Sequence, residues 1–282
     1  MASISVLMSV YRSDNPTFFD RAIQSIWTDQ SMPPNDVILV EDGPLPEALQ
    51  DVVKKWERII GDKLIILKNE QNIGLTKSLN KGIAKATCEY IARMDSDDIS
   101  MPERFRLQSD FLDKHSDITV VGGSLQEFDS KNENLNVRHY PLTPKEVESF
   151  IHRGSPLAHP TVMIRKKLFD DGILYDERYR TSQDIALWFD VLCAGYKIAN
   201  LDQVTIKFRR DGEVYKRRSK EKAKNEFKIY MNGIKRLNGL FTFKYIYPTL
   251  RYFFRLMPVA FVKRIYGSKL RAYVLRTKSS SN

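Results

Sequence analysis

Apolar and polar residues alternate along the first third of the chain in a way that predicts strands and helices in turn. Short, largely apolar runs typical of buried strands occupy residues 4–10, 37–40, 64–67 and 90–94. Between the first two runs, apolar side chains recur at helical spacing at Phe18, Phe19, Ala22, Ile23 and Ile26. Asp14, Asn15 and Pro16 supply a cap and a first-turn proline for this helix. Two further helices are expected, one ending at Gly61 and one over residues 75–86.

Strands separated by helices of this length predict a parallel sheet with right-handed crossovers. In such sheets, ligands bind beyond the carboxyl ends of the strands. The residues at these ends are Tyr11-Arg12, Glu41-Asp42-Gly43 and Asp95-Ser96-Asp97-Asp98. We therefore expect these three segments to face one crevice.

After Asp98 the alternation weakens, and the remaining elements are less regular. The pattern predicts a helix over 102–114, strands over 119–123 and 161–165, a helix over 184–194 and a last strand over 204–210. The fold class is therefore α/β. We expect one large unit over residues 1–212 and a helical region over residues 213–282.

The composition of the 282 residues is that of a globular protein, with 42% hydrophobic and 28% charged residues. This excludes a disordered or fibrous chain. Cys88 and Cys193 are too few for a disulfide framework or a multi-cysteine zinc site. We find neither a signal-peptide pattern nor a run of the roughly 18 apolar residues that a spanning helix needs. These features favour a reduced, cytosolic protein.

The positive charge is concentrated at the C-terminal end. Of the 45 Lys and Arg and the 35 Asp and Glu, residues 207–282 contain 21 and 4, which leaves 24 and 31 for residues 1–206. The net charges are thus +17 and −7. An acidic body with a basic tail suggests an enzyme domain whose tail meets an anionic surface.

The candidate chemistry lies in the acidic turn Asp95-Ser96-Asp97-Asp98, directly after a buried strand. Crowded carboxylates repel one another unless a cation holds them together. Oxygen-only ligands favour Mg²⁺ or Mn²⁺, and such ions commonly bridge carboxylates to a diphosphate. The alternative is an acidic cap on the helix that follows.

Several motifs of the chain resemble family-2 glycosyltransferases of the GT-A fold. They are Asn72-Ile73-Gly74-Leu75, Asn80-Lys81-Gly82-Ile83, the stretch 90–98, the opening strand 5–11, Val40-Glu41-Asp42-Gly43 and the run 159–166. The resemblance covers residues 3–210. It implies a GT-A domain with a C-terminal basic, aromatic-rich helical extension, and transfer of a sugar from a nucleotide-sugar donor, with a UDP-sugar favoured.

The resemblance also implies roles for individual residues. Tyr11 and Asp42 would hold the nucleotide base, Asp95 would contact the ribose, and Asp97 would bind Mn²⁺ or Mg²⁺. Ser9 and Ser96 would complete the donor site. Tyr11 could instead be a packing aromatic, and Asp42 could be a turn residue.

The chain departs from the family pattern near Asn80. The family usually has an arginine just before this position, where it reaches the diphosphate, and this chain has Leu79. Lys77 is a candidate substitute, although it could equally be a solvated helix lysine.

A second departure lies at Gln183-Asp184, where the family typically has Glu-Asp. The resemblance implies that Asp184 is the general base that takes the proton of the acceptor hydroxyl. A positioned carboxylate of this kind contributes roughly 10²–10⁴-fold to a rate. The implied reaction is a single displacement with inversion. Asp184 could also cap its helix, and His159 is more typical of a structural histidine.

The C-terminal region combines basic and aromatic residues. A basic helix is expected from residue 216 to 237, and Arg217 and Arg218 could lie near the donor phosphates or form a solvated face. Ten Phe and Tyr residues follow between 241 and 273, and residues 258–274 show helical amphipathic spacing. Such a segment suits an anionic membrane surface, at the inner face of the cell membrane. The alternatives are packing on the catalytic domain and oligomer formation.

The sequence is compatible with three functions. The resemblance favours a glycosyltransferase that builds a bacterial surface polysaccharide, such as O-antigen or capsule, on a lipid-diphosphate-linked acceptor. A nucleotidyltransferase would also use an acidic strand-end metal site. A nucleic-acid-binding protein would use the basic tail, but it leaves the acidic turn unexplained. We therefore expect no nucleic-acid partner.

Overall fold

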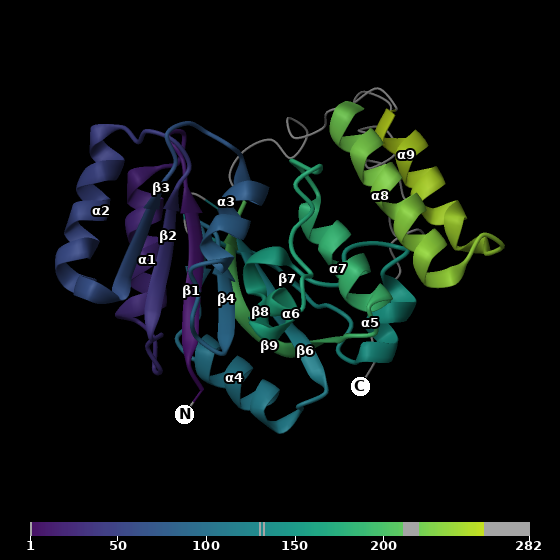
Figure 1. The fold of residues 1–282 in the computed structure, drawn as a ribbon, viewed down its shortest axis with the longest axis horizontal. Helices are drawn as coiled ribbons and strands as arrows, with labels where there is room; N and C mark the ends of the chain where they lie inside the picture. Colours follow the sequence, from purple (N-terminus) through teal and green to yellow (C-terminus); the bar gives the residue numbers. More distant parts are fainter. Residues whose placement is uncertain (1, 130, 132, 211–219, 257–282) are drawn as a thin grey trace.

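A computed structural model describes residues 2–129, 131, 133–210 and 220–256 of the chain. A mixed β-sheet runs through the centre of the molecule with helices on both faces, and a helical hairpin lies at one side (Figure 1). The strand order is β3-β2-β1-β4-β8-β6-β9-β5, with β7 paired to β6. The expected Arg217 and Arg218 pair and the expected helix over 258–274 lie outside the described residues.

The first half of the sheet is parallel, as the hydrophobic pattern predicts. It contains β1 (Ile4–Val10), β2 (Asp36–Glu41), β3 (Leu64–Lys68) and β4 (Tyr90–Met94), which follow the predicted strands to within one residue. The crossover helices are α1 (Pro16–Trp27), α2 (Glu47–Ile60) and α3 (Leu75–Ile83). Asn15 caps α1 through its side chain, which accepts hydrogen bonds from Thr17 N and Phe18 N.

Alternate residues of the strands point to opposite faces, so the core has two layers. Val6, Met8 and Val10 of β1 pack in the layer of α1, α2 and α4 (Arg104–Lys114). Leu7 packs in the other layer, with α3 and α7 (Gln183–Cys193). Both faces of the parallel strands are therefore covered, and the carboxyl ends of the strands remain for a ligand.

The second half of the sheet is mixed. β8 (Met163–Arg165) is antiparallel to β4 and to β6 (Ile118–Phe128), and β9 (Lys197–Arg209) is parallel to β6. β5 (Ile99–Ser100) and β7 (Asn134–Arg138) are short antiparallel additions. β6 and β9 are longer than predicted, because polar residues such as Gln126 and Asp202 interrupt the apolar pattern while the backbone pairing continues with register shifts.

Shorter helical elements connect these strands. They are the α-helices α5 (Pro144–Phe150) and α6 (Lys167–Asp170) and the 3₁₀ turns η1 (Gly61–Lys63) and η2 (His159–Thr161). Thr143 and Glu146 form a capping box at the start of α5.

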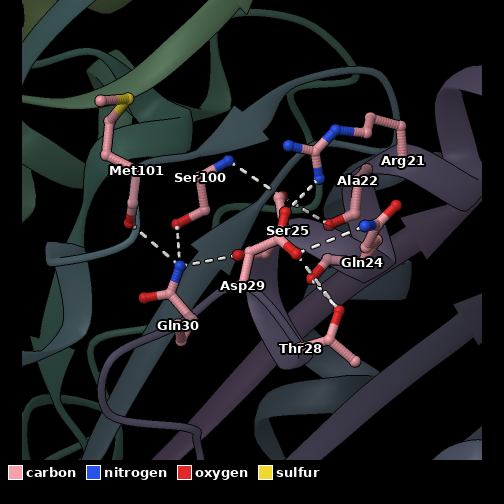
Figure 2. Close-up of polar contacts among 9 residues, drawn as sticks. All are labelled: Arg21, Ala22, Gln24, Ser25, Thr28, Asp29, Gln30, Ser100 and Met101. Atoms are coloured by element: carbon pink, nitrogen blue, oxygen red, sulfur yellow. Dashed lines mark hydrogen bonds and ion pairs between the residues drawn. The ribbon is translucent and has the colours of Figure 1, made fainter.

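The segment after the acidic turn is tied to the end of α1 (Figure 2). Gln30 donates from Nε2 to the carbonyl oxygens of Ser25 (2.6 Å) and Met101 (3.0 Å) and to Ser100 Oγ (3.3 Å). The backbone N–H of Ser100 in turn donates to Ser25 Oγ (2.9 Å). Because these groups are largely buried, their mutual hydrogen bonds fix the chain directly after residues 95–98.

The C-terminal helices α8 (Lys220–Asn238) and α9 (Ile246–Leu256), joined through the 3₁₀ turn η3 (Phe243–Tyr245), form the hairpin at the side of the molecule (Figure 1). α8 packs on α7, where Tyr230 meets Phe189 edge-on with ring centroids 5.7 Å apart. Gly233 allows the close approach, since a Cβ atom there would lie 2.3 Å from the Phe189 ring. The expected boundary after residue 212 falls in a range that the structure does not describe. No helix within the described ranges is long and apolar enough to span a bilayer.

Candidate functional site

A cavity of about 460 Å³ opens at the carboxyl ends of β1, β2 and β4. Its lining is Ser9, Tyr11, Asp14, Asp42, Asn72, Gly74, Leu75, Asp95, Ser96, Asp97, Arg180, Phe208 and Arg209. The expectation that the three strand ends share one crevice is therefore confirmed. The volume is in the range of small-molecule and cofactor sites.

The acidic turn contains carboxyl groups whose pKa values are strongly raised. Single carboxylate oxygens of Asp95, Asp97 and Asp98 lie within 4.8 Å of one another. Burial, followed by the charges of Asp95 and Asp14, raises the pKa of Asp97 to about 6. Burial, followed by the charges of Asp95 and Asp97, raises the pKa of Asp98 well above its ordinary value. These groups are crowded enough that a cation between them would relieve the repulsion.

The donor atoms of this turn suit a hard divalent cation. All three side chains offer oxygen, which Mg²⁺ and Mn²⁺ prefer. Asp98 Oδ1 accepts a hydrogen bond from the backbone N–H of Arg209 (2.8 Å), whereas Asp98 Oδ2 is buried without a hydrogen-bond partner among the described residues. Asp98 thus orders the turn against β9, while Asp95 and Asp97 face the cavity.

Arg93 lies under the acidic turn and connects it to the rest of the site. Its Nη2 donates to Asp95, while its buried Nε and Nη1 have no hydrogen-bond partner within the described ranges. The Arg93 charge lowers the pKa of both Asp97 and Asp184 against the upward effect of their burial. This buried cation therefore pairs with Asp95 and acts electrostatically on both Asp97 and Asp184.

Ser9, Tyr11 and Ser96 also line the cavity. The Tyr11 side chain is 43% exposed, so its ring is open to a ligand. Asp14, read from the sequence only as part of a helix start, accepts hydrogen bonds from Ser96 Oγ (2.8 Å) and from the Tyr11 N–H (3.1 Å). Burial raises the pKa of Asp14. Asp14 thus ties two of the predicted donor-site residues together, a contact that their separation in the sequence did not indicate.

Asp42 lines the cavity directly after the end of β2. Its Oδ1 accepts hydrogen bonds from Ile73 N (2.8 Å) and Asn69 Nδ2 (3.1 Å), and its Oδ2 accepts one from Gly74 N (3.0 Å). Gly43 follows at φ +93°, where a Cβ atom would lie 2.8 Å from Asn72 N. Asp42 therefore holds the turn before α3, and because a carboxylate has about four acceptor positions, one remains for a ligand.

The cationic residues of the cavity are not those expected from the sequence. Lys77 is exposed on α3 and is not part of the cavity lining, because its helix position turns it outward. Leu79 is buried in the core. Arg180 and Arg209, which the sequence analysis did not select, line the cavity instead. They come from the segments before α7 and at the end of β9, and no spacing along the chain links either to the acidic turn.

Asp184 lies in the first turn of α7, outside the cavity lining. Ser182 precedes this turn in the left-handed region (φ 60°, ψ 23°), an uncommon conformation for a residue with a side chain. Burial raises the pKa of Asp184, and hydrogen bonds from the backbone and the charge of Arg93 oppose this. Gln183, the residue before Asp184, is buried.

His159 is structural in this arrangement, as expected. It is buried, and its Nε2 lies 2.7 Å from the Tyr175 hydroxyl. Burial lowers the pKa of His159 well below its ordinary value. The neutral ring therefore packs edge-on against Tyr175 and Trp188.

Comparison with known proteins identifies relatives along most of the chain. The profile of the family described as "Glycosyl transferase family 2" matches residues 5–173. Over 264 residues the chain is 31% identical to the amylovoran biosynthesis glycosyltransferase AmsE of Erwinia amylovora, covering 93% of this chain and 97% of AmsE. Over 272 residues it is 30% identical to an Escherichia coli enzyme described as UDP-Gal:alpha-D-GlcNAc-diphosphoundecaprenol beta-1,3-galactosyltransferase, covering 96% and 97%.

A solved structure with the same architecture is that of S. aureus TarS 1–349 in complex with UDP-GlcNAc. The superposition has a TM-score of 0.63 at 19% sequence identity and covers 98% of this chain and 76% of the TarS chain. At this identity the likeness establishes the fold alone. The expected α/β GT-A class, with a helical extension after the last strand, is confirmed.

Proposed function

The chain belongs to glycosyl transferase family 2, and on this basis we propose that it transfers a sugar from a UDP-sugar to a saccharide carried on a lipid diphosphate. The observation that carries the proposal is the cavity at the strand ends, where an acidic turn, an open tyrosine ring and two arginines meet. The product would be part of a bacterial surface polysaccharide.

The choice of donor rests on the cavity and on the relatives. The cavity has room for a nucleotide, with an aromatic ring for stacking on a base and carboxylates for the ribose. The E. coli relative is named for UDP-Gal, and the TarS structure holds UDP-GlcNAc. We propose that Tyr11 and Asp42 contact the base, that Asp95 binds the ribose, and that Ser9 and Ser96 complete the site. The sugar is a hexose or an N-acetylhexosamine.

Mn²⁺ or Mg²⁺ would be held by Asp97, with Asp95 and Asp98 nearby. Such an ion supplies positive charge that stabilises a departing nucleoside diphosphate. Arg93 holds Asp95 in place beneath the cavity, and Arg209 holds the backbone of Asp97 through a hydrogen bond from Nε (3.0 Å). These contacts restrain the Asp95 carboxylate and the Asp97 backbone, which supports the proposal of a cation site at this turn.

We propose Asp184 as the general base. A sugar hydroxyl is a weak nucleophile at neutral pH, and a carboxylate that accepts its proton as the bond forms accelerates attack. The raised pKa of Asp184 makes the carboxylate a stronger base than an ordinary aspartate. Attack from the side opposite the diphosphate would break the sugar–phosphate bond in one step and invert the anomeric carbon.

The proposal is tested by following product release from a panel of UDP-sugars with Mn²⁺ and a synthetic GlcNAc-diphosphate-lipid. We expect UDP and one elongated lipid from one donor, and slower UDP release by hydrolysis without acceptor. Release of sugar 1-phosphate in place of UDP would show transfer of the nucleotidyl group, and thus a nucleotidyltransferase. The absence of both UDP binding and UDP release with every donor tested would contradict the proposed activity.

We further propose that the hairpin of α8 and α9 contacts an anionic membrane surface. Its apolar side chains form the hairpin patch: Leu240, Phe241, Phe243, Ile246, Tyr247, Leu250, Phe253 and Leu256, all exposed, with Phe241 at 100%. Four exposed lysines follow one side of α8 at Lys220, Lys224, Lys228 and Lys235. No ion pair of these lysines occurs among the residues described. Apolar side chains beside unpaired lysines suit a membrane with acidic headgroups.

Vesicle cosedimentation tests the hairpin patch with the full chain. We expect binding to phosphatidylglycerol vesicles that weakens with salt, and little binding to phosphatidylcholine vesicles. Replacing Phe241 and Phe243 by Ser should weaken binding about tenfold or more, since each buried aromatic contributes about 1.5–3 kcal/mol. Ile59→Ser, an exposed apolar residue on α2, is the matched control. Unchanged vesicle binding, or binding to nucleic acid only, would refute this part of the proposal.

A further inference from the structure

The donor cavity has an uneven distribution of charge. Four carboxylates line it, those of Asp14, Asp42, Asp95 and Asp97, whereas its basic residues are Arg180 and Arg209. A nucleoside diphosphate adds further negative charge. The residue before Asn80 is a buried leucine and offers no positive charge. Among the described residues, these two arginines are therefore the cationic side chains placed to meet the diphosphate if the cavity holds a nucleotide sugar.

Arg209 is already engaged with the protein. Its backbone N–H and its Nε hold Asp98 and the Asp97 carbonyl, respectively. Its guanidinium lies between two aromatic rings, 3.7 Å from the centroid of Phe18 and 4.4 Å from that of Phe128. These contacts fix the plane of the guanidinium, so Arg209 supports the acidic turn and has little freedom to follow a ligand.

Arg180 differs in being exposed and unengaged. Within the described ranges it forms no hydrogen bond, ion pair or ring contact. Its guanidinium lies over Gly74 at the N-terminus of α3, where Nη2 is 3.4 Å from the position that a Cβ atom would take. A guanidinium and the amino end of a helix both favour an anion.

The segment that carries Arg180 is docked on α3. Asn80 Nδ2 donates to the Tyr175 carbonyl (2.8 Å), and the Tyr175 N–H donates back to Asn80 Oδ1 (3.1 Å). Thr76 Oγ1 donates to the Tyr179 carbonyl (2.6 Å). Because the backbone is held at Tyr175 and Tyr179, the next residue is delivered to the start of the helix.

We propose that Arg180 binds the diphosphate of the donor, an inference that rests on the proposed function. In the family pattern an arginine just before Asn80 on α3 supplies this positive charge. Here the segment before the proposed base Asp184 supplies it, and α3 holds that segment in place. Arg180 is four residues before Asp184, with the left-handed Ser182 between them. Binding of the diphosphate therefore also restrains the chain that leads to the base.

Isothermal titration of the full chain with UDP, UMP and uridine tests this assignment. Arg180→Ala should weaken UDP binding about tenfold or more, UMP binding less, and uridine binding not at all, since a charge-assisted contact acts on phosphate only. Arg180→Lys should restore part of the loss, because lysine keeps the charge without the two-pronged geometry. Arg178→Ala is the matched control, an exposed arginine outside the cavity that pairs with Asp176.

The possible results distinguish a failure of the proposed donor from a failure of the Arg180 assignment. Wild-type chain that binds no UDP would reject the proposed donor. Wild-type chain that binds UDP, with Arg180→Ala binding it equally well, would overturn the role of Arg180 alone. A loss of UDP binding in Lys77→Ala as large as that in Arg180→Ala would also overturn it, since the sequence expectation for Lys77 would then hold. Equal melting temperatures of all variants would show that folding is not the cause.

Discussion

Charged and apolar side chains are arranged in opposite ways in the cavity at the strand ends and on the helical hairpin. In the cavity, carboxylates are crowded, partly buried and tied to neighbouring donors, as Asp42 and Asp14 show. On the hairpin, lysines are spread along α8 and the aromatic side chains stand in solvent. Concentrated charge in a confined space selects a small ligand of fixed shape. Spread charge beside exposed apolar surface suits a broad, deformable partner.

The two regions nevertheless meet at one interface. α7 carries Asp184 at its start and packs along its length against α8, where Gly233 lies on Phe189. Lys222 of α8 contributes to the electrostatic environment of Asp184. If the hairpin contacts a membrane, the packing of α8 on α7 links that contact to the helix that begins at the proposed base.

The largest effect is expected from Asp184→Asn, which removes the proposed base and leaves the cavity intact. We expect transfer to slow by about 10²–10⁴-fold, because the acceptor proton loses its carboxylate acceptor. UDP affinity should change less than about twofold, since Asp184 does not line the cavity. Single-turnover kinetics measure the rate of transfer, and titration with UDP measures the affinity. Loss of UDP binding would mean that Asp184 supports the donor site instead.

The next effect is expected from Asp97→Asn, which alters the cavity and not the base. Turnover should fall by about 100-fold or more, and the dependence on added Mn²⁺ should weaken, because a carboxylate ligand is lost. Asp110→Asn, on the exposed side of α4, serves as the control. Full activity of Asp97→Asn in the presence of a chelator would rule out the metal role.

A smaller effect is expected where the two regions meet. Gly233→Ala places a methyl group 2.3 Å from the Phe189 ring, and overpacking of this kind costs about 1–3 kcal/mol. Thermal or urea unfolding should detect the loss, while Asn232→Ala, an exposed neighbour, should not change the free energy of unfolding. If UDP affinity is unchanged in Gly233→Ala, the hairpin and the donor cavity are energetically separable.

The smallest effect concerns the pH dependence of stability. Because burial raises the pKa of Asp184 in the folded chain, the folded state holds this proton more tightly than the unfolded state. The Asp184 contribution to stability is therefore most favourable below the unfolded pKa and is lost as pH rises through the folded pKa. Asp184→Asn should melt slightly higher than wild type at pH 8, and the difference should shrink toward pH 3. A constant difference across this range would contradict the raised pKa.

The parallel half of the fold could be read from the sequence because local pattern and tertiary environment agree there. Residues 4–10 and 90–94 are apolar throughout, as strands covered on both faces must be, and both appear as predicted. The later strands were only partly predicted. β9 begins at Lys197, before the expected start, because backbone pairing with β6 continues through polar residues that face outward.

The site was predictable to the extent that its residues follow strands directly. Tyr11, Asp42 and Asp97 lie at strand ends, so the position of each in the cavity follows from the topology of a parallel sheet. Lys77 and Arg180 do not lie at strand ends, so their positions did not follow from the sheet topology. The turn of α3 directs Lys77 outward, and hydrogen bonds from α3 to a segment about 100 residues away bring Arg180 in.

The sequence alone determined the order of the first strands and helices, the acidic turn and the concentration of basic residues toward the C-terminus, because each depends on neighbouring residues. Only the tertiary structure decided which cations face the carboxylates and which aromatic side chains of the hairpin remain exposed. Those outcomes depend on packing between distant segments, such as α3 with residues 175–180 and α7 with α8. Local spacing in a chain carries no record of such contacts.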